Sequence, residues 1–378
     1  MAHICYAIQG EGRGHATRGR AIVELLRDRG HRVTLFTSGQ ALELLRASYT
    51  DTEVEVHAIP GVAWAYRADR SVDYARTFSG AVPFMARLDK LSASLGRTLE
   101  HLAPDLLVTD FEPAMPRAAC RIGLPFMSVD HQHVLTAADL SALPVQLRAW
   151  VAFLRPFVGM WHGGEVEQVV SSFFWPGPRR GQERVVPIGV LLRPEVLDTR
   201  PEVHDHLLVY VRRHAPQSLL DALRGTGLPI RIYGLGERRD EGRVQFCPVS
   251  IDGFLEDLAT CRGLVCTAGN QLIGEALHLR KPVFAMPEGG NHEQMINAWF
   301  IARSPWGMTA PIDRVDSLAL RRFVRDLEAL RVTMDPLGVA GNQDAVDRIE
   351  ANLPLSARGV PHAARPVAVP AGVQEPAA

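Results

Sequence analysis

A run of small residues from Thr267 to Asn270 is the first pattern in this chain that suggests chemistry. It follows a short apolar stretch, residues 263–266, and opens a segment with helical spacing that carries one carboxylate, Glu275. Backbone N–H groups at the start of a helix attract phosphate, because their dipoles point outward there. A carboxylate about two turns further on could accept hydrogen bonds from both hydroxyls of a ribose. The run therefore predicts a phosphate and ribose site.

A second polar run, PEGGNHEQMINA at 287–298, follows the next apolar stretch. Its Glu293 and Gln294 side chains are suited to hydrogen-bonding sugar hydroxyls. Taken together, the two runs predict a binding site for a sugar nucleotide.

His15 ends a glycine-rich loop, Gly10-Glu-Gly-Arg-Gly14, that follows the first apolar stretch of the chain. At the turn from a strand to a helix it would lie at the carboxyl edge of a sheet, where open α/β folds bind ligands. A neutral imidazole there can accept a proton from a hydroxyl. Asp110 ends another predicted strand at the same edge and could orient the imidazole. The alternative is that His15 only packs and Asp110 only caps a helix.

The glycine loop also resembles a dinucleotide-binding fingerprint, which would place an acid at the end of the second strand. Residues 30–40 contain no Asp or Glu, so hydride transfer is disfavoured. No lysine follows a glycine, which excludes a phosphate-binding P-loop.

Asp130, His131 and His133 form a third polar group, at the end of a further predicted strand. They could line a cleft for an acceptor. Their spacing is also compatible with metal ligands, but no other cluster in the sequence supports a metal site, and none is expected.

The composition is that of an ordinary globular protein, with 378 residues, 47 % hydrophobic and 22 % charged residues. The formal net charge of −1 argues against binding nucleic acid. The five cysteines have neither zinc-binding nor redox spacing. Because no secretory or membrane-spanning segment is evident, we expect a cytoplasmic location, with the inner face of the membrane as an alternative.

Short apolar stretches alternate with helical patterns along the whole chain, which indicates parallel sheets covered on both faces. We expect an α/β protein with two Rossmann-like doubly wound domains, residues 1–190 and 191–355. A tail rich in Pro and Ala, residues 356–378, is expected to be disordered. In the first domain we expect strands at 4–8, 32–37, 54–59, 105–109 and 125–129, and helices at 16–29, 84–102 and 114–121. In the second we expect strands at 207–211, 230–233, 243–246, 263–266 and 282–285, and helices at 217–223, 251–260, 293–302, 317–330 and 344–353.

An aromatic stripe, Trp150, Phe153, Phe157 and Trp161, recurs at helical spacing within 142–161. Such stripes usually belong to a core. The sharper interpretation is a wall for an apolar acceptor or a patch that contacts a membrane surface.

These motifs resemble those of GT-B-fold glycosyltransferases, the MurG-like family and the wider UDP-glycosyltransferase superfamily. The resemblance extends to about residue 353 and implies two domains that face each other across a cleft. It implies that the N-terminal domain binds the acceptor and the C-terminal domain the nucleotide sugar. His15 falls on the position of the family's base, and Asp110 on that of its partner in some members.

On the donor side, the resemblance assigns Glu275 to the ribose and Gly269 with Asn270 to the diphosphate. Ser250 and Ile251 fall where the family lines the pocket for the base. Glu293 and Gln294 fall where it contacts the donor sugar. Gly14 and Thr267 complete the expected donor contacts. The family's Gly/Ser-rich turn is replaced by Arg212-Arg-His214, so Arg212 is expected to supply a charge to the diphosphate instead.

The implied activity is metal-independent, inverting transfer of a sugar to a hydroxyl or amine, with His15 as the general base. No cofactor is expected beyond the co-substrate, a UDP- or dTDP-sugar, with GDP also open. The acceptor could be a glycan, a lipid or a natural product, and peripheral membrane contact is open. Two alternatives of the same fold are a nucleotide-sugar hydrolase and a 2-epimerase. A third is a non-catalytic protein that binds sugar nucleotides.

Overall fold

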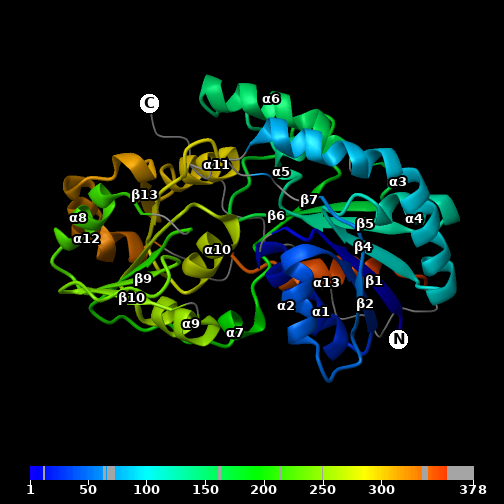
Figure 1. Ribbon diagram of the computed structural model, residues 1–378, viewed down its shortest axis with the longest axis horizontal. Coiled ribbons are helices and arrows are strands. Elements are labelled where there is room, and N and C mark those ends of the chain that lie inside the picture. The colour runs from blue at the N-terminus through cyan, green and yellow to red at the C-terminus, as the bar shows by residue number, and fades with distance from the viewer. Residues whose placement is uncertain are drawn as a thin grey trace. The chain divides into compact units, whose positions relative to one another are not determined.

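The computed structural model describes residues 1–11, 13–62, 65, 73–160, 163–212, 215–248, 250–333 and 339–355 (Figure 1). The chain divides into two compact units. Unit 1 comprises Met1–Ala142, Arg148–Pro194 and the described residues from Gly341 to Leu355. Unit 2 comprises Glu195–Ala340 together with the short segment Leu143–Leu147.

Unit 1 is built on a parallel sheet of seven strands in the order β3-β2-β1-β4-β5-β6-β7. The strands are β1 (His3–Ile8), β2 (Arg32–Thr37), β3 (Glu55–Ala58), β4 (Leu106–Asp110), β5 (Phe126–Asp130), β6 (Glu167–Ser171) and β7 (Val186–Ile188). The helices are α1 (Arg13–Asp28), α2 (Gly39–Ser48), α3 (Tyr74–Leu102), α4 (Met115–Ile122), α5 (Val134–Ala137), α6 (Val145–Gly159), which begins in the segment grouped with unit 2, and α13 (Asn342–Ala351).

Alternation along β1 explains why both faces of this sheet are covered. Ile4 and Tyr6 point into a core shared with α1, α2 and α13. Cys5 and Ala7 point to the opposite face, into a core shared with α3 and α4. Successive side chains of a strand alternate between faces, so a fully apolar strand needs helices on both sides. Figure 1 shows this three-layer arrangement around β1 and β4.

Unit 2 contains a parallel sheet of six strands in the order β10-β9-β8-β11-β12-β13. Helices α8 and α12 cover one face of it, through apolar side chains such as Leu223 and Phe323. The strands are β8 (Leu207–Tyr210), β9 (Ile230–Tyr233), β10 (Val244–Cys247), β11 (Gly263–Cys266), β12 (Val283–Ala285) and β13 (Gly307–Thr309). The helices are α7 (Pro194–Leu197) at the boundary, α8 (Gln217–Arg224), α9 (Ile251–Thr260), α10 (Asn270–His278), α11 (His292–Ile301), the 3₁₀ turn η1 (Ile312–Arg314) and α12 (Ser317–Val332).

Both sheets are doubly wound, and each has one point where the strand order reverses. In unit 1 this switch point lies between β1 and β4. In unit 2 it lies between β8 and β11. In open α/β sheets the loops at the carboxyl ends of the two switch-point strands diverge, which leaves room for a ligand.

The last described helix corrects the expected domain division. The boundary near residue 190 lies close to the observed one, but α13 packs on α1 in unit 1 instead of completing unit 2. Val346 and Ile349 are fully buried in the unit 1 core. The side-chain amide of Asn342 also exchanges hydrogen bonds with the backbone of Leu192, at 2.9 and 2.6 Å.

The expected strands and the longer helices are present, with ends that differ by one or two residues in most cases. Helix α3 begins about ten residues earlier than expected, at Tyr74. Strands β6, β7 and β13, helix α2 and the short helices α5 and α7 were not expected. The region around β7 is rich in Pro, Gly and Arg, a composition that is not typical of a strand. The tail from residue 356 lies outside the described residues.

Candidate functional site

The β1–α1 junction carries His15 to the carboxyl edge of the unit 1 sheet. Gly10 lies so close to the end of β2 that a Cβ atom there would be 2.1 Å from the Ser38 Oγ. A glycine is therefore required for the chain to pass this point. Helix α1 then begins at Arg13, which places His15 in its first turn, 12 % exposed. Gly14, an expected donor contact, lies in the same turn.

His15 and Asp110 meet at the switch point of unit 1. The strand register pairs Ile8 with Asp110, so Asp110 lies beside the end of β1. The His15 Nδ1 atom lies 3.0 Å from the Asp110 Oδ1. The sequence therefore identified both members of this contact, and the parallel register explains why they meet.

Arg18 is a third member of the cluster, one that the sequence did not reveal. Its Nε and Nη2 atoms donate to the two Asp110 oxygens at 3.2 and 2.9 Å. Arg18 and Asp110 are buried, and the Arg18 guanidinium with the His15 imidazole holds the Asp110 pKa near 2 against the opposing effect of burial. Asp110 is thus a stable anion. The signal that could have revealed Arg18 is its i, i+3 spacing from His15 on one helix.

Gln132 completes a consistent network around the imidazole. Its Nε2 atom lies 3.2 Å from the His15 Nε2, and its Oε1 accepts from Arg18 at 3.4 Å. If Nδ1 of His15 carries the proton and donates to Asp110, Nε2 accepts from Gln132, and only the contact between Arg18 Nη2 and His15 Nδ1 brings two donors together. The Arg18 Nη2 atom, 2.9 Å from the His15 Nδ1, then converges with it on the same Asp110 oxygen. This tautomer leaves Nε2 as the basic nitrogen.

The turn after β4 gives Asp110 and Glu112 different partners. Phe111, between them, has a φ of 56°, a conformation that is rare for a bulky side chain. Glu112 is buried and its carboxylate accepts from the backbone N–H groups of Ala114 and Met115 at the start of α4. Burial raises the Glu112 pKa to about 7. Glu112 therefore caps a helix, while Asp110 faces the cluster.

The third polar group expected on the acceptor side is buried within unit 1. Asp130 and His133 form an ion-pair contact with each other. His131 Nδ1 donates to the Ser171 carbonyl oxygen at 2.9 Å. Gln132, which lies between the two histidines, is half-buried and contacts His15 instead. The sequence did not reveal it.

In unit 2, the run from Thr267 to Asn270, which the sequence predicts to bind phosphate, lies at the switch point between β8 and β11. Gly269 is the N-cap of α10, and it provides no side-chain cap for the first turn. Asn270 is the first residue of the helix, and Thr267 lies in the buried turn before it. The Asn297 side chain of α11 donates to the Ala268 carbonyl at 2.9 Å. The two polar runs of the sequence are thus tied together.

Glu275 lies on α10, 4 % exposed, and accepts from Gln271 at 3.4 Å. On α11, Gln294 is buried while Glu293 is exposed. Gln294 exchanges hydrogen bonds with Glu288, donating from Nε2 at 3.2 Å and accepting from the Glu288 N–H at 2.8 Å.

Arg212 follows β8 at the same edge, as expected from the departure in its loop. Its Nη1 atom lies 3.7 Å from the Glu288 Oε2, and its side chain is 43 % exposed. Glu288 was not predicted. Glu288 links Arg212 to Gln294. Its position three residues after the end of β12, at the carboxyl edge of the sheet, is the sequence signal that could have marked it as a site residue.

Ser250 and Ile251, expected near the nucleotide base, begin helix α9. The Ser250 hydroxyl accepts from the Gly253 N–H at 3.1 Å and so caps the helix. Ile251 is the first residue of that helix, after the Ser250 cap.

The aromatic stripe lies on α6. Phe153 contacts Trp150 and Phe157 with ring centroids 5.5 Å apart in both pairs. Phe153 is 46 % exposed, and Val145 and Met160 are exposed beside it, so the stripe is not a core. Trp161 lies outside the described residues. No helix in the described parts of the chain is long and apolar enough to cross a membrane.

The chain was compared with known proteins. The family model for glycosyl transferase family 1 matches residues 2–328. No curated protein sequence matches the chain significantly. The crystal structure of the glycotransferase of kitacinnamycin has a TM-score of 0.63 at 18 % identity, over 93 % of this chain and 99 % of its own. The structure of Arabidopsis thaliana UGT89C1 complexed with UDP-L-rhamnose has a TM-score of 0.64 at 14 % identity, over 92 % of this chain and 98 % of its own. The structure of the glycosyltransferase VinC in complex with dTDP has a TM-score of 0.57 at 12 % identity, over 93 % of this chain and 99 % of its own.

At these identities the solved structures establish a shared fold, and they confirm the expected GT-B architecture of two parallel sheets flanked by helices. The family model covers most of the sequence, including both switch points. The chain therefore belongs to glycosyl transferase family 1 and is a glycosyltransferase.

Proposed function

We propose that this glycosyltransferase moves a sugar from a nucleotide-sugar donor to an acceptor hydroxyl or amine, with inversion and without a metal ion. The observation that carries the proposal is the His15–Asp110–Arg18 cluster at the switch point of unit 1. A buried anion bonded to one imidazole nitrogen orients the other nitrogen as a base.

In the proposed reaction, His15 Nε2 takes the proton of the acceptor as the acceptor oxygen or nitrogen attacks the anomeric carbon. The acceptor group must replace the Gln132 amide, which now lies 3.2 Å from that nitrogen. Asp110 stabilises the imidazolium that forms, through the 3.0 Å contact to Nδ1. The bond to the leaving diphosphate breaks on the opposite face of the sugar, which inverts the anomeric centre.

On the donor side, negative charge develops on the leaving diphosphate. The first-turn N–H groups of α10, beyond Gly269 and Asn270, supply positive dipole there. Arg212 can supply a full positive charge, since 43 % of its side chain is exposed and can be reached by a ligand. We assign Glu275 to the ribose, Glu293 and Gln294 to the donor sugar, and Thr267, Ser250, Ile251 and Gly14 to the remaining donor contacts.

The donor we propose is a UDP- or dTDP-sugar. Support comes from structural neighbours, one complexed with UDP-L-rhamnose and one with dTDP. The Arabidopsis neighbour has also been crystallised with quercetin. Membrane contact through α6 and a cytoplasmic location stay predictions from the sequence.

The test is nucleotide release from a panel of UDP- and dTDP-sugars by the full-length protein, with and without hydroxylated aromatic acceptors. His15→Ala should lower the rate by about 10²–10⁴-fold, the usual contribution of a general base. Glu275→Ala should weaken donor binding, and EDTA should leave the rate unchanged. His101→Ala, an exposed histidine of α3, is the matched control.

Equal turnover by His15→Ala would remove the base assignment. Acceptor-independent release of free sugar would identify a hydrolase instead, and interconversion of donor sugars a 2-epimerase. Donor binding with no turnover of any kind would identify a binding protein. The anomeric configuration of the product, measured by NMR, decides between inversion and retention.

A further inference from the structure

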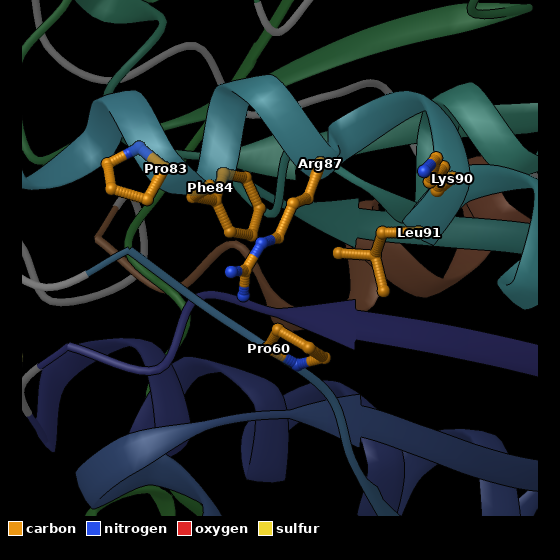
Figure 2. Close-up of a pocket in the computed structure, with 6 residues that line it drawn as sticks. All are labelled: Pro60, Pro83, Phe84, Arg87, Lys90 and Leu91. Atoms are coloured by element: carbon orange, nitrogen blue, oxygen red, sulfur yellow. The ribbon is translucent and has the colours of Figure 1, made fainter.

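An open pocket of about 560 Å³ lies in unit 1 between α3 and the segment that follows β3 (Figure 2). This volume suits a small molecule of drug size. The α3 residues that line it recur at helical spacing and so share one side of the helix. The lining residues are Pro60 after β3 and Pro83, Phe84, Arg87, Lys90 and Leu91 of α3.

The pocket combines apolar walls with two cations and no acid among its lining residues. In the described structure no hydrogen bond or ion pair ties Arg87 or Lys90. Asp89, between them in sequence, forms an ion pair with Arg121 of α4 instead. The Arg87 guanidinium extends from α3 toward Pro60 (Figure 2). Lys90 is one of two lysines in the chain, and the other, Lys281, is buried.

The pocket lies at the same edge of the sheet as the loop that carries His15. Pro60 lies two residues after Ala58, past the carboxyl end of β3. The Gln9 Nε2 atom, at the end of β1, donates to the Val62 carbonyl at 3.2 Å. A Cβ atom on Gly61 would lie 2.0 Å from the Ser38 Oγ, the same atom that Gly10 approaches. The segment forming one wall of the pocket therefore packs against the β1–α1 loop.

We propose that this pocket binds the acceptor, and that the acceptor is an amphipathic small molecule in which an apolar skeleton carries a carboxylate or a phosphate. Phe84, Leu91 and the two prolines contact the skeleton, while Arg87 and Lys90 bind the anionic group. This inference rests on the proposed transfer reaction for its meaning, but binding to the pocket is measurable without a donor. Hydrogen bonds to charged groups contribute more than neutral ones, so the anion decides selectivity.

The probes are 6-hydroxy-2-naphthoate, the corresponding naphthyl phosphate and the neutral 6-hydroxy-2-naphthamide, titrated into the full-length protein and followed by calorimetry. The wild type should bind both anions about ten-fold more tightly than the amide. The double variant Arg87→Gln/Lys90→Gln should lose this preference while binding the amide as before. Arg97→Gln, an exposed arginine of α3 outside the pocket, should keep the preference. The ratio between the two anions distinguishes a carboxylate from a phosphate acceptor.

Equal wild-type binding of anion and amide would overturn the inference. Retention of the preference by the double variant would also overturn it. Loss of amide binding by the double variant would overturn it as well, because the substitutions would then have changed the shape of the pocket and not only its charge. Loss of UDP-sugar binding in the double variant would make it a donor site. With a donor present, the double variant should raise KM for the anionic probe and keep kcat. Inactivity of the wild type toward every donor would count against the proposed function and leave the binding result intact.

Discussion

The Asp110 carboxylate serves two cationic or potentially cationic neighbours at once. Its Oδ1 is shared by His15 Nδ1 and Arg18 Nη2, and its Oδ2 accepts from Arg18 Nε. Arg18 offsets the cost of burying a charge next to the imidazole, so the anion persists before the reaction begins. The bidentate geometry also fixes the carboxylate plane, and with it the direction of the bond to His15.

At the residue scale, Arg18→Gln should lower the free energy of unfolding by about 3 kcal/mol, because it leaves a buried carboxylate without its main partner. The low Asp110 pKa, about 2 against the usual 3.8, contributes stability above pH 3.8 that is lost as the pH falls through 2. Acid unfolding of the variant should therefore begin at a higher pH. Urea unfolding at pH 7 and acid titration measure both effects.

The matched control is Arg46→Gln, which removes an exposed arginine of α2. It should change the free energy of unfolding by less than about 0.5 kcal/mol, as is usual for surface substitutions. A similarly small effect of Arg18→Gln would show that the buried pair contributes nothing measurable.

Residue types predicted the contact between His15 and Asp110 better than they predicted the side chains that hold it. His15 and Asp110 were found because a histidine after a glycine loop and an acid at a strand end are chemically distinctive. Arg18 is one of many arginines in a chain with few lysines, so its identity carried no signal. Gln132 was hidden between two histidines that the structure buries.

At the element scale, Glu112 makes the start of α4 sensitive to pH. Its pKa is raised to about 7 from the usual 4.5 by burial. The stabilisation from the protonated form is fully present below pH 4.5, declines as the pH rises, and is lost above about 7. The pKa shift of Glu112 corresponds to ~3 kcal/mol in the free energy of unfolding. Between these values the unfolded chain releases the proton and the folded chain retains it.

Glu112→Gln, which mimics the protonated acid, should unfold with nearly the wild-type free energy at pH 4.5 and be more stable by about 2–3 kcal/mol at pH 8. Denaturant unfolding across this range measures the divergence. Asp316→Asn, at the exposed N-cap of α12, is the control and should track the wild type between pH 5 and 8. Parallel curves for wild type and Glu112→Gln would contradict the assignment.

Elements with a strong apolar period were predicted from sequence, and those defined by their neighbours were not. Residues 4–8 of β1 are buried and mostly apolar because helices cover both faces of that sheet, and β11 is fully buried. Strand β6 begins with Glu167 and Gln168, half-buried at their sheet positions, and so lacks that signal. Helix α2 begins at a glycine with a φ of 51°, which a sequence pattern treats as a break.

At the scale of the whole molecule, α13 is part of unit 1 although it comes last. Its charged side contacts the end of α1, where Arg29 donates to Asp347 and Glu350 at 2.7 Å each. His31 Nε2 lies 2.9 Å from the other Glu350 oxygen. The apolar side, with Val346 and Ile349, completes the core beneath β1. No pattern within residues 342–351 reveals this partner, because contacts so distant in sequence leave no local trace.

A chain that ends at residue 340 should lose the buried side of α13 and with it several kcal/mol of unit 1 stability, since each fully buried aliphatic side chain contributes about 1.5–3 kcal/mol. Hydrogen exchange should show faster amide exchange in β1 and α1, with β8 and β11 unchanged. A chain that ends at residue 355 is the control and should match the full-length protein. Faster exchange in β8 instead would place the helix with unit 2.

The position of α13 also sets an order of events during synthesis. A ribosome adds about 5–20 residues per second, and domains usually fold as they emerge, the first one earliest. Here the core beneath β1 waits for residues 342–351, whereas the strands and helices of unit 2 between 195 and 333 have been made before them. Until α13 has been made, the part of the α1 surface that it covers stays exposed in the nascent chain. The base of the proposed reaction is thus made long before the helix that finishes its unit.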